Sequence, residues 1–322
     1  MTRPSRRCFE TVEGFDDVFA TNVRSPFFYG KTYGRCFGRK GSTGMGSTTG
    51  TARARTGVRK LMQWREIRMV QHDRTALVTG ASRGIGRATA LALAETGAHV
   101  LVHYGRSAQE AESLVSEIHT KGGRANAFSA DLGTPNGAAL VAKQVRSIVG
   151  DRLDVLVSNA GISKAATIKD HTVEDFDNLF ATNVRSPFFL VQQLLPILGD
   201  GSNIIVISSI GSHAVVGKPG LDNPSILAYA STKGALETLV KNWAAILGPQ
   251  GIRVNAVAPG VIDTDMSNFT KTEAGREATL GMQALKRIGK PEDVADVVAF
   301  LASEKARWIT GASIPVDGGS KL

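Results

Sequence analysis

From Thr75 onward, short runs of β-branched and other apolar residues alternate with amphipathic segments of helical length. The predicted strands are residues 76–79, 100–104, 125–130, 155–158, 204–208, 254–258 and 313–316, and helical periodicity is found for example at 87–95, 108–121, 138–149 and 291–303. Such alternation requires right-handed crossovers and a parallel sheet that helices cover on both faces. We therefore predict a single doubly wound α/β domain with about seven strands.

The first 68 residues differ from this pattern in charge and composition. Between Met1 and Arg68, 14 Lys and Arg residues stand against 5 Asp and Glu, which accounts for the net charge of +9, whereas the charges of residues 69–322 cancel. Gly, Ser, Thr and Arg dominate up to about Trp64 with no persistent period, so we expect residues 1–68 to be a disordered extension. A basic tail does not indicate a nucleic-acid-binding face on the folded domain, and we expect no nucleic-acid partner.

The two cysteines, Cys8 and Cys36, both belong to this extension. The remaining chain can form neither a disulfide framework nor a thiolate metal site, and His99, His103 and His213 form no ligand cluster, so we expect no metal. Apolar runs are far shorter than the roughly 20 residues of a membrane-spanning helix. We predict a soluble, cytoplasmic protein that does not associate with a membrane.

One segment of the extension is a near copy of a later one. Residues 11–28 read TVEGFDDVFATNVRSPFF and residues 172–189 read TVEDFDNLFATNVRSPFF, so 15 of 18 positions match. Two copies about 160 residues apart do not make a repeat architecture. We interpret the first copy as a displaced fragment, with Met69 as an alternative start. A transit peptide fits the Arg and Ser content but not the acidic residues Glu10, Glu13, Asp16 and Asp17.

The first predicted strand leads through Thr79-Gly-Ala-Ser-Arg-Gly-Ile-Gly86 into a helix. This is the context of a dinucleotide-binding turn. Gly80 would permit the tight turn, Gly84 the approach of a pyrophosphate to the backbone, and Gly86 the close packing of helix on strand. Taken alone, the cluster could equally be a plain turn.

Tyr229 and Lys233 lie four residues apart at the start of a predicted helix. This spacing places a phenol and an ammonium group on one helical face, where the cation favours the tyrosinate. A free tyrosine titrates near pH ~10, so acid–base chemistry at neutral pH needs such a neighbour. Taken alone, the pair occurs by chance in many helices.

Together, the two motifs resemble those of the short-chain dehydrogenase/reductase superfamily, whose fold is Rossmann-type. The resemblance runs from about Val70 to the C-terminus. Further motifs typical of the family are Asp131-Leu132, Ser158-Asn-Ala-Gly161, Ile207-Ser-Ser209, Pro259-Gly260, Ile309-Thr-Gly311 and Val316-Asp-Gly-Gly319. The resemblance implies an NADP(H)-dependent oxidoreductase that exchanges a carbonyl for a secondary alcohol. It also implies a homo-oligomer, a tetramer or a dimer.

The resemblance also implies roles for single residues. Tyr229 would be the general acid or base, and Lys233 would lower the pKa of Tyr229 and hold the nicotinamide ribose. Ser209 would bind the substrate carbonyl, with Ser208 as a rival, and Asn183 would anchor a water of the proton relay. The implied cofactor contacts are Gly80, Ser82, Arg83, Gly84, Ile85, Gly86, Tyr104, Arg106, Asp131, Leu132, Asn159, Ala160, Gly161, Tyr229, Lys233, Pro259, Gly260, Ile262 and Thr264.

Several of these contacts have plainer interpretations. Asp131 could be a helix N-cap, and Asn159 and Thr264 could be turn residues. The choice of NADP(H) over NAD(H) depends on the end of the second strand, where Tyr104 replaces the acidic residue that suits a free ribose hydroxyl. Arg83 and Arg106 could each bind a 2′-phosphate.

The substrate is poorly encoded, and a small ketone or a 3-oxoacyl group both fit. Reductases of 3-oxoacyl groups on a carrier protein usually have basic residues where this chain has Asp200 and Gln250, which weakens that alternative. The 19 residues between Ser209 and Tyr229 exceed the family's usual dozen and should reshape the substrate mouth. A non-catalytic nucleotide-binding regulator would lack Tyr229 or Lys233, and neither is missing.

We predict that a chain starting at Met69 folds and keeps full activity. Asn183→Ala should impair catalysis and Asn22→Ala should not, because no predicted strand lies near Asn22 to fix it in a site. Carbonyl reduction by the full-length and shortened proteins measures this. A shortened protein that is insoluble or inactive, beside an active full-length one, would show that the extension belongs to the fold.

Overall fold

The computed structural model describes residues 74–216, 220–320 and 322. The predictions for residues 1–68, including the copy at 11–28 and the start at Met69, lie outside the described residues. Seven strands form one sheet in the order β3-β2-β1-β4-β5-β6-β7, and every pair is parallel. The strands are β1 (Thr75–Val78), β2 (His99–Tyr104), β3 (Arg124–Ser129), β4 (Val155–Ser158), β5 (Asn203–Ile207), β6 (Arg253–Pro259) and β7 (Ser313–Val316). This confirms the predicted doubly wound, Rossmann-type domain.

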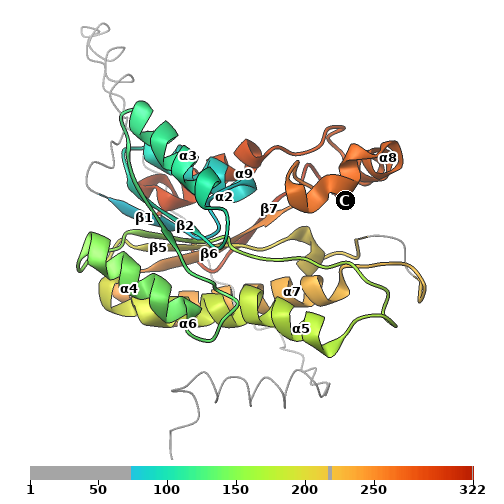
Figure 1. Cartoon of the computed structure of the whole chain (residues 1–322), viewed down its shortest axis with the longest axis horizontal. Helices are drawn as coiled ribbons and strands as arrows, with labels where there is room; N and C mark the ends of the chain where they lie inside the picture. Colours follow the sequence, from blue (N-terminus) through green and yellow to red (C-terminus); the bar gives the residue numbers. More distant parts are fainter. Residues whose placement is uncertain (1–73, 217–219, 321) are drawn as a thin grey trace, which may run out of the picture. The chain divides into compact units, whose positions relative to one another are not determined.

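Helices cover both faces of the sheet (Figure 1). On one face lie α2 (Gly84–Glu95), α3 (Ala108–Thr120) and α9 (Pro291–Ala302), and on the other α4 (Gly137–Val149), α5 (Val173–Phe180), α6 (Ser186–Leu194) and α7 (Leu227–Leu247), while α8 (Glu273–Met282) projects beyond the sheet. In the part of the chain that the structure describes, no helix is long and apolar enough to cross a membrane. The same residues contain no cluster of His, Cys, Asp and Glu able to hold a metal ion.

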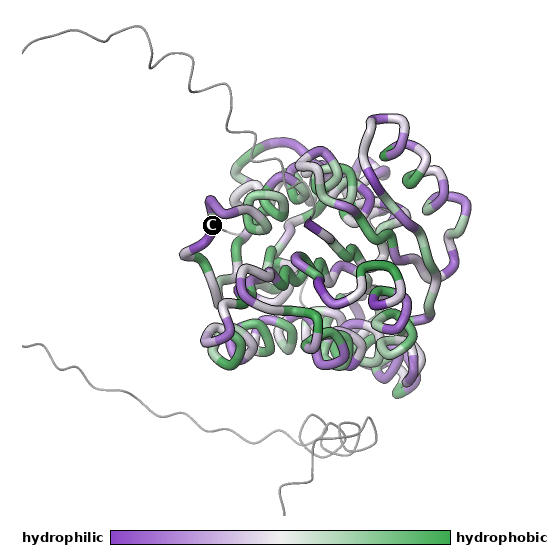
Figure 2. Tube along the Cα trace, turned by 90° about the vertical axis from the view of Figure 1, so that its left-hand side faces the viewer, coloured by the Kyte–Doolittle hydropathy of each residue, from purple (hydrophilic) through white to green (hydrophobic). Residues whose placement is uncertain are grey.

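The pattern of burial explains why the chain folds in this order. Every residue of β4 and of β5 is buried, as expected for central parallel strands packed on both faces. The edge strand β3 alternates exposed and buried residues instead. The central strands are accordingly rich in hydrophobic residues, and Figure 2 shows hydrophobic stretches in the interior of the domain. The hydrophobic effect therefore determines which strands lie in the middle of the sheet.

The strand order reverses between β1 and β4, and crevices in such sheets open at this point on the carboxyl edge. Thr79 joins the two strand ends there, since its hydroxyl accepts hydrogen bonds of 3.0 Å from the backbone N–H groups of Asn159 and Ala160. The Asn159 amide donates in return to the carbonyl oxygens of Thr79, at 2.8 Å, and Gly80, at 3.0 Å. These four bonds fix the start of the glycine turn against the end of β4.

His103, near the end of β2, holds the same turn from the other side. Its Nδ1 accepts a hydrogen bond from the backbone N–H of Gly80 at 3.2 Å, so the proton of the neutral ring is on Nε2, which donates to the carbonyl of Ala130 at 3.0 Å. Burial lowers the pKa of His103 to about 4, and the bond to Ala130 opposes this only in part. The imidazole is therefore neutral at physiological pH and acts as a structural link.

We predict that protonation of His103 destabilises the fold in acid. Because the pKa is about 4 in the folded chain and 6.5 in the unfolded one, the unfolded state binds more protons between these values. The stabilisation is complete above pH ~6.5 and is lost as the pH falls toward ~4, by about 3 kcal/mol in total. Urea unfolding of the wild type and of His103→Gln across this range should give a difference that depends on pH. A pH-independent difference would contradict the assignment.

Candidate active site

The glycine turn leaves no space for side chains at its closest approaches. Gly80 and Gly84 have φ angles of +62° and +55°, which side chains rarely adopt. A Cβ atom on Gly86 would lie 2.5 Å from the Asn159 amide nitrogen, and one on Gly80 would lie 3.0 Å from the Cα atom of Ala160. This backbone leads directly into the N-terminus of α2, whose first turn has no acidic residue. The turn therefore fits the pyrophosphate of a dinucleotide.

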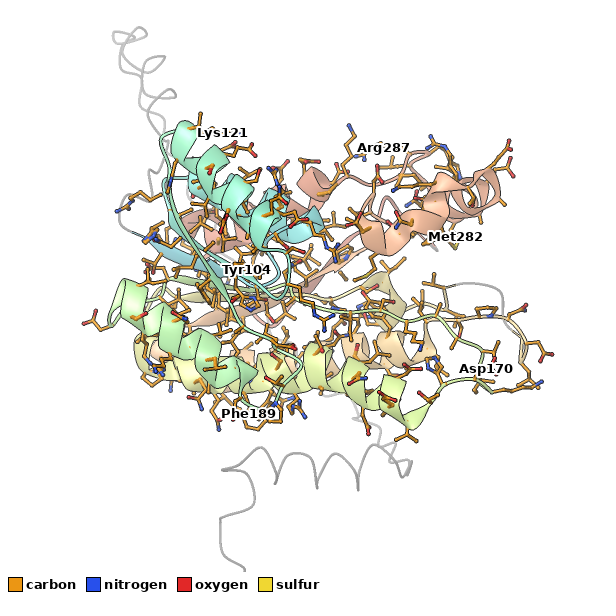
Figure 3. All side chains as sticks on the ribbon, viewed as in Figure 1. Tyr104, Lys121, Asp170, Phe189, Met282 and Arg287 are labelled. Carbon is orange, nitrogen blue, oxygen red and sulfur yellow. The ribbon has the colours of Figure 1, made fainter. Side chains whose placement is uncertain are left out.

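The three residues considered for cofactor choice are placed differently. Tyr104 ends β2 and packs partly buried against the core, between the two helical layers (Figure 3), while Arg106 is exposed beyond it. Arg83 precedes α2, and its guanidinium forms an ion pair of 3.0 Å with Asp265, although both side chains are more than 60% exposed. Arg83 would have to share its charge between Asp265 and a phosphate, whereas Arg106 is exposed to solvent.

The residues expected to contact the adenine ring lie just beyond β3. Asp131 is exposed, and its carboxylate accepts the backbone N–H of Gly133 at 2.9 Å, which closes a turn. It does not cap a helix, since α4 begins only at Gly137. Its neighbour Leu132 is buried.

The segment after β6 packs against the glycine turn. A Cβ atom on Gly84 would lie 3.1 Å from the Thr264 methyl group. Thr264 caps the 3₁₀ segment η5 (Asp265–Lys271), and Ile262 before it is buried. A Cβ atom on Gly260 would meet the Cα atom of Asp317 at 2.7 Å, so this glycine is required for close packing against the chain beyond β7. The predicted contacts Pro259 to Thr264 therefore border the same crevice from the side of β6.

The predicted catalytic pair lies in the first two turns of α7. Tyr229 and Lys233 are both buried, and the Lys233 Nζ atom lies 5.4 Å from the centre of the Tyr229 ring. Nζ also donates a hydrogen bond of 2.8 Å to the carbonyl of Ile207, the last residue of β5. Burial lowers the pKa of Lys233 to about 8. The structure thus brings together the two groups that the spacing of four residues predicted.

The pKa of Tyr229 moves in the direction opposite to the expected one. Burial raises the pKa because it disfavours the phenolate, and a hydrogen bond with Ser209 lowers it by less. The resemblance implied a lowered pKa through Lys233, but desolvation raises the pKa by more than the Ser209 hydrogen bond lowers it. Tyr229 is consequently a protonated phenol at neutral pH, which is the form required of a proton donor.

The structure also separates the two candidate serines. Ser209 is partly exposed just beyond β5 and hydrogen-bonds Tyr229, whereas Ser208 is buried and donates to the carboxylate of Glu237 at 2.8 Å. Ser209 therefore contacts the phenol, and Ser208 does not face a substrate.

Asn183 lies on a π-helical turn, η1 (Ala181–Arg185), between α5 and α6. Such turns are frequent at functional sites because they displace a side chain from regular helical positions. The Asn183 amide accepts the N–H of Ile162 and donates to its carbonyl, both at 2.9 Å, and also donates to the hydroxyl of Thr232 at 3.1 Å. A Cβ atom on Gly161 would lie 3.2 Å from Asn183 Oδ1 and 3.7 Å from Lys233 Nζ. The side chains of Asn183 and Lys233 thus both lie close to the backbone of Gly161.

A cavity of about 610 Å³ opens beside η3 (Ile210–Ser212) and the start of α7. Most of the side chains that line it are apolar, among them Ile168, Val215, Leu221 and Ile226, and His213 adds a polar ring. Asp170, close to Ile168 in the chain, lies on the right of the view in Figure 3, on the same side of the domain as α8. Described residues of the long segment between Ser209 and Tyr229 therefore form much of the lining of this cavity.

Three structural residues of the site were not predicted. Thr79 and His103 fix the glycine turn, and Glu237 binds the segment around Ser209. The leading threonine of the glycine motif was a visible signal for Thr79. The partners of His103 and Glu237 are distant in the sequence, and no local pattern identifies them.

Comparison with known proteins gives consistent matches. A family model described as enoyl-(acyl carrier protein) reductase matches residues 80–321. Versicolorin reductase 1 of Aspergillus parasiticus is 41% identical over 260 residues, which are 77% of this chain and 96% of the relative. The 3-oxoacyl-acyl-carrier-protein reductase of Staphylococcus epidermidis is 40% identical over 247 residues, 77% of this chain and 98% of the relative.

A solved structure supports the same relationship. The short-chain dehydrogenase of Burkholderia cenocepacia in complex with NADP has a TM-score of 0.73 and 37% sequence identity, and the match covers 79% of this chain and all of the other. At this identity the likeness includes the sequence as well as the fold.

Proposed function

This chain belongs to the short-chain dehydrogenase/reductase superfamily and is an NADP(H)-dependent oxidoreductase that interconverts a carbonyl and an alcohol, and from this premise we propose that Tyr229 moves the proton of the reaction. The observation that supports the proposal best is the position of Lys233, whose Nζ atom lies 5.4 Å from the centre of the Tyr229 ring, with Ser209 as the partner of the phenol. NADP(H), when bound, supplies or accepts the hydride at the carbonyl carbon.

In the direction of reduction, the protonated phenol of Tyr229 donates its proton to the substrate oxygen. The raised pKa of Tyr229 keeps the phenol protonated before this step. Ser209 orients the same oxygen by a hydrogen bond and stabilises the negative charge that develops on it. In oxidation, the same groups act in the reverse order.

Lys233 and Asn183 support this proton transfer. The Lys233 ammonium group stabilises the tyrosinate left after donation, because an opposite charge within a few ångströms favours the ionised form. A pKa of about 8 allows Lys233 to return a proton near neutral pH. Asn183 forms hydrogen bonds with the backbone of Ile162 and the hydroxyl of Thr232. These bonds fix the Asn183 amide behind Lys233, where it can take part in the proton relay.

Tyr229→Phe should lower kcat by at least a hundredfold while leaving the Kd for NADPH within about threefold, because the variant loses the proton but keeps the ring. The measurement follows NADPH absorbance with 2-tetralone, and separately with an acetoacetyl thioester, as carbonyl probes. Titration of NADPH fluorescence serves as the control for binding. A variant that keeps more than a tenth of the wild-type kcat on both probes would remove Tyr229 from the proposed role.

The ribose 2′-phosphate has two candidate partners, Arg106 and Arg83. We propose that Arg106 contributes more, since Arg83 is already paired with Asp265. A charge-assisted hydrogen bond to a phosphate contributes about 1.5–3 kcal/mol, so Arg106→Ala should reduce the preference for NADPH over NADH about tenfold or more.

The matched control for this prediction is Asp265→Ala, which frees Arg83 from its ion pair. The kcat/KM ratio for NADPH and NADH measures each variant. Substitutions of Arg106 and Arg83 that both leave the ratio unchanged would overturn this account of cofactor choice.

The cavity favours a compact apolar ketone as the substrate. Its side chains offer hydrophobic contact over most of their surface, and an apolar ring or chain gains about 25 cal/mol for each Å² removed from water. A 3-oxoacyl group on an acyl carrier protein is the second candidate, which the bacterial relative supports. Asp200 and Gln250 do not supply the basic contacts that an acidic carrier needs.

A further inference from the structure

The third group on the catalytic face of α7 is a buried carboxylate. Glu237 follows Lys233 by four residues and Tyr229 by eight, so the three side chains lie on one face of the helix. Glu237 is only 7% exposed. An ionised group in such a place needs strong partners, because removal of a charge from water is costly.

Glu237 binds four side chains that come from two parts of the chain, the segment 208–213 and β7. Its Oε1 atom accepts hydrogen bonds from the hydroxyl groups of Ser208 at 2.8 Å, Ser212 at 2.7 Å and Ser313 at 3.0 Å. Its Oε2 atom lies 2.7 Å from Nε2 of His213. Hydrogen bonds to an ionised oxygen are about twice as strong as those between neutral groups.

Three of these four partners surround Ser209 in the sequence. Ser208 precedes it, and Ser212 and His213 follow at the end of η3. The Ser212 hydroxyl also lies 2.6 Å from the Ser209 carbonyl, but it has one proton, and the carboxylate is the stronger acceptor. The segment 208–213 is therefore attached to α7 on both sides of Ser209.

The Ser209 hydroxyl, by contrast, is only lightly held by its own segment. It accepts one hydrogen bond from the backbone N–H of Gly211 at 3.1 Å and otherwise meets Tyr229. Its position relative to the phenol thus depends on where the backbone of 208–212 lies. An error of about 1 Å in such a position can cost a hundredfold in rate.

We propose that Glu237 is a positioning residue, which holds segment 208–213 against α7 so that Ser209 faces Tyr229. The inference rests on the proposed roles of Ser209 and Tyr229. Because Tyr229 and Glu237 belong to one rigid helix, the carboxylate fixes the distance between the serine and the phenol. Glu237 makes no bond to the phenol among those that the structure describes, and it reaches the cavity only through Ser212 and His213, which line it.

Two substitutions separate shape from hydrogen bonding. Glu237→Gln keeps a carbonyl oxygen for the three serines and turns an amide N–H toward His213, whose neutral ring can accept it. Glu237→Met keeps the length of the side chain but accepts none of these bonds. Ser313→Ala is the matched control, because it removes one bond to the same carboxylate from β7, which has no link to Ser209.

The experiment measures kcat, KM and the Kd for NADPH, with 2-tetralone as the carbonyl probe and thermal unfolding as the test of folding. Glu237→Met should lower kcat about tenfold to a hundredfold and leave the Kd for NADPH within about threefold. Glu237→Gln and Ser313→Ala should stay within about threefold of wild type in kcat. A loss of kcat in Ser313→Ala equal to that in Glu237→Met would overturn the proposal, since a general structural role would then explain both.

A double-mutant cycle with Ser209→Ala gives the sharper test. If Glu237 acts through Ser209, Glu237→Met should cost less than about threefold in kcat once Ser209 is already alanine. An equal cost in both backgrounds would show that Glu237 acts elsewhere. Should Glu237→Met not fold, the Ser208→Ala/Ser212→Ala variant removes two of the three attachments between segment 208–213 and Glu237 and enters the cycle in its place.

The cycle also distinguishes the two proposals from each other. If Ser209→Ala alone leaves kcat unchanged, the proposed role of Ser209 is wrong, whatever Glu237 does. If Ser209→Ala lowers kcat strongly but shows no coupling with Glu237, the proposed function stands and only the positioning role fails.

Discussion

All seven strands run in the same direction, and therefore each of them releases the chain at the same edge of the sheet. This constraint brings four segments to one edge of the sheet: the glycine turn, the Asn159 turn, Ser209 and the Gly260 turn. Their separate segments still have to be held at fixed distances. Side-chain hydrogen bonds to the backbone do this, from Thr79 and Asn159 between β1 and β4 and from His103 between β2 and β1. The site is thus built from strand ends and tied together by polar residues that do no chemistry.

The sequence predicts most of the frame because local signals encode it. The strand expected at 76–79 is found at Thr75–Val78, and the helix expected at 291–303 is found at Pro291–Ala302. The periodicity of buried residues and the start signals of helices are sufficient for such assignments. The approach of Tyr229 to Lys233 was equally visible, since a spacing of four residues on one helix determines the geometry of the pair.

What the sequence does not predict depends on contacts between distant residues. His103 meets Ala130 across 27 positions, and Glu237 meets Ser313 across 76, so neither bond has a local pattern. The direction of the Tyr229 pKa was wrong for a related reason. The neighbour Lys233 is evident in the sequence, whereas the burial that raises the pKa of Tyr229 is a property of the assembled fold. The choice between Ser208 and Ser209 also required knowledge of which one points toward α7.

The attachment of residues 208–213 to α7 has a consequence for how such enzymes diverge. It ends at His213, and the bonds to the carboxylate that the structure describes include none from the cavity-lining residues Ala214, Val215, Leu221 and Ile226. Mutations in that stretch can alter the shape of the cavity while the serine, the phenol and the ammonium keep their spacing. On the proposed function, substrate range and reaction type would then depend on largely different residues of one segment, with Ser212 and His213 shared between them.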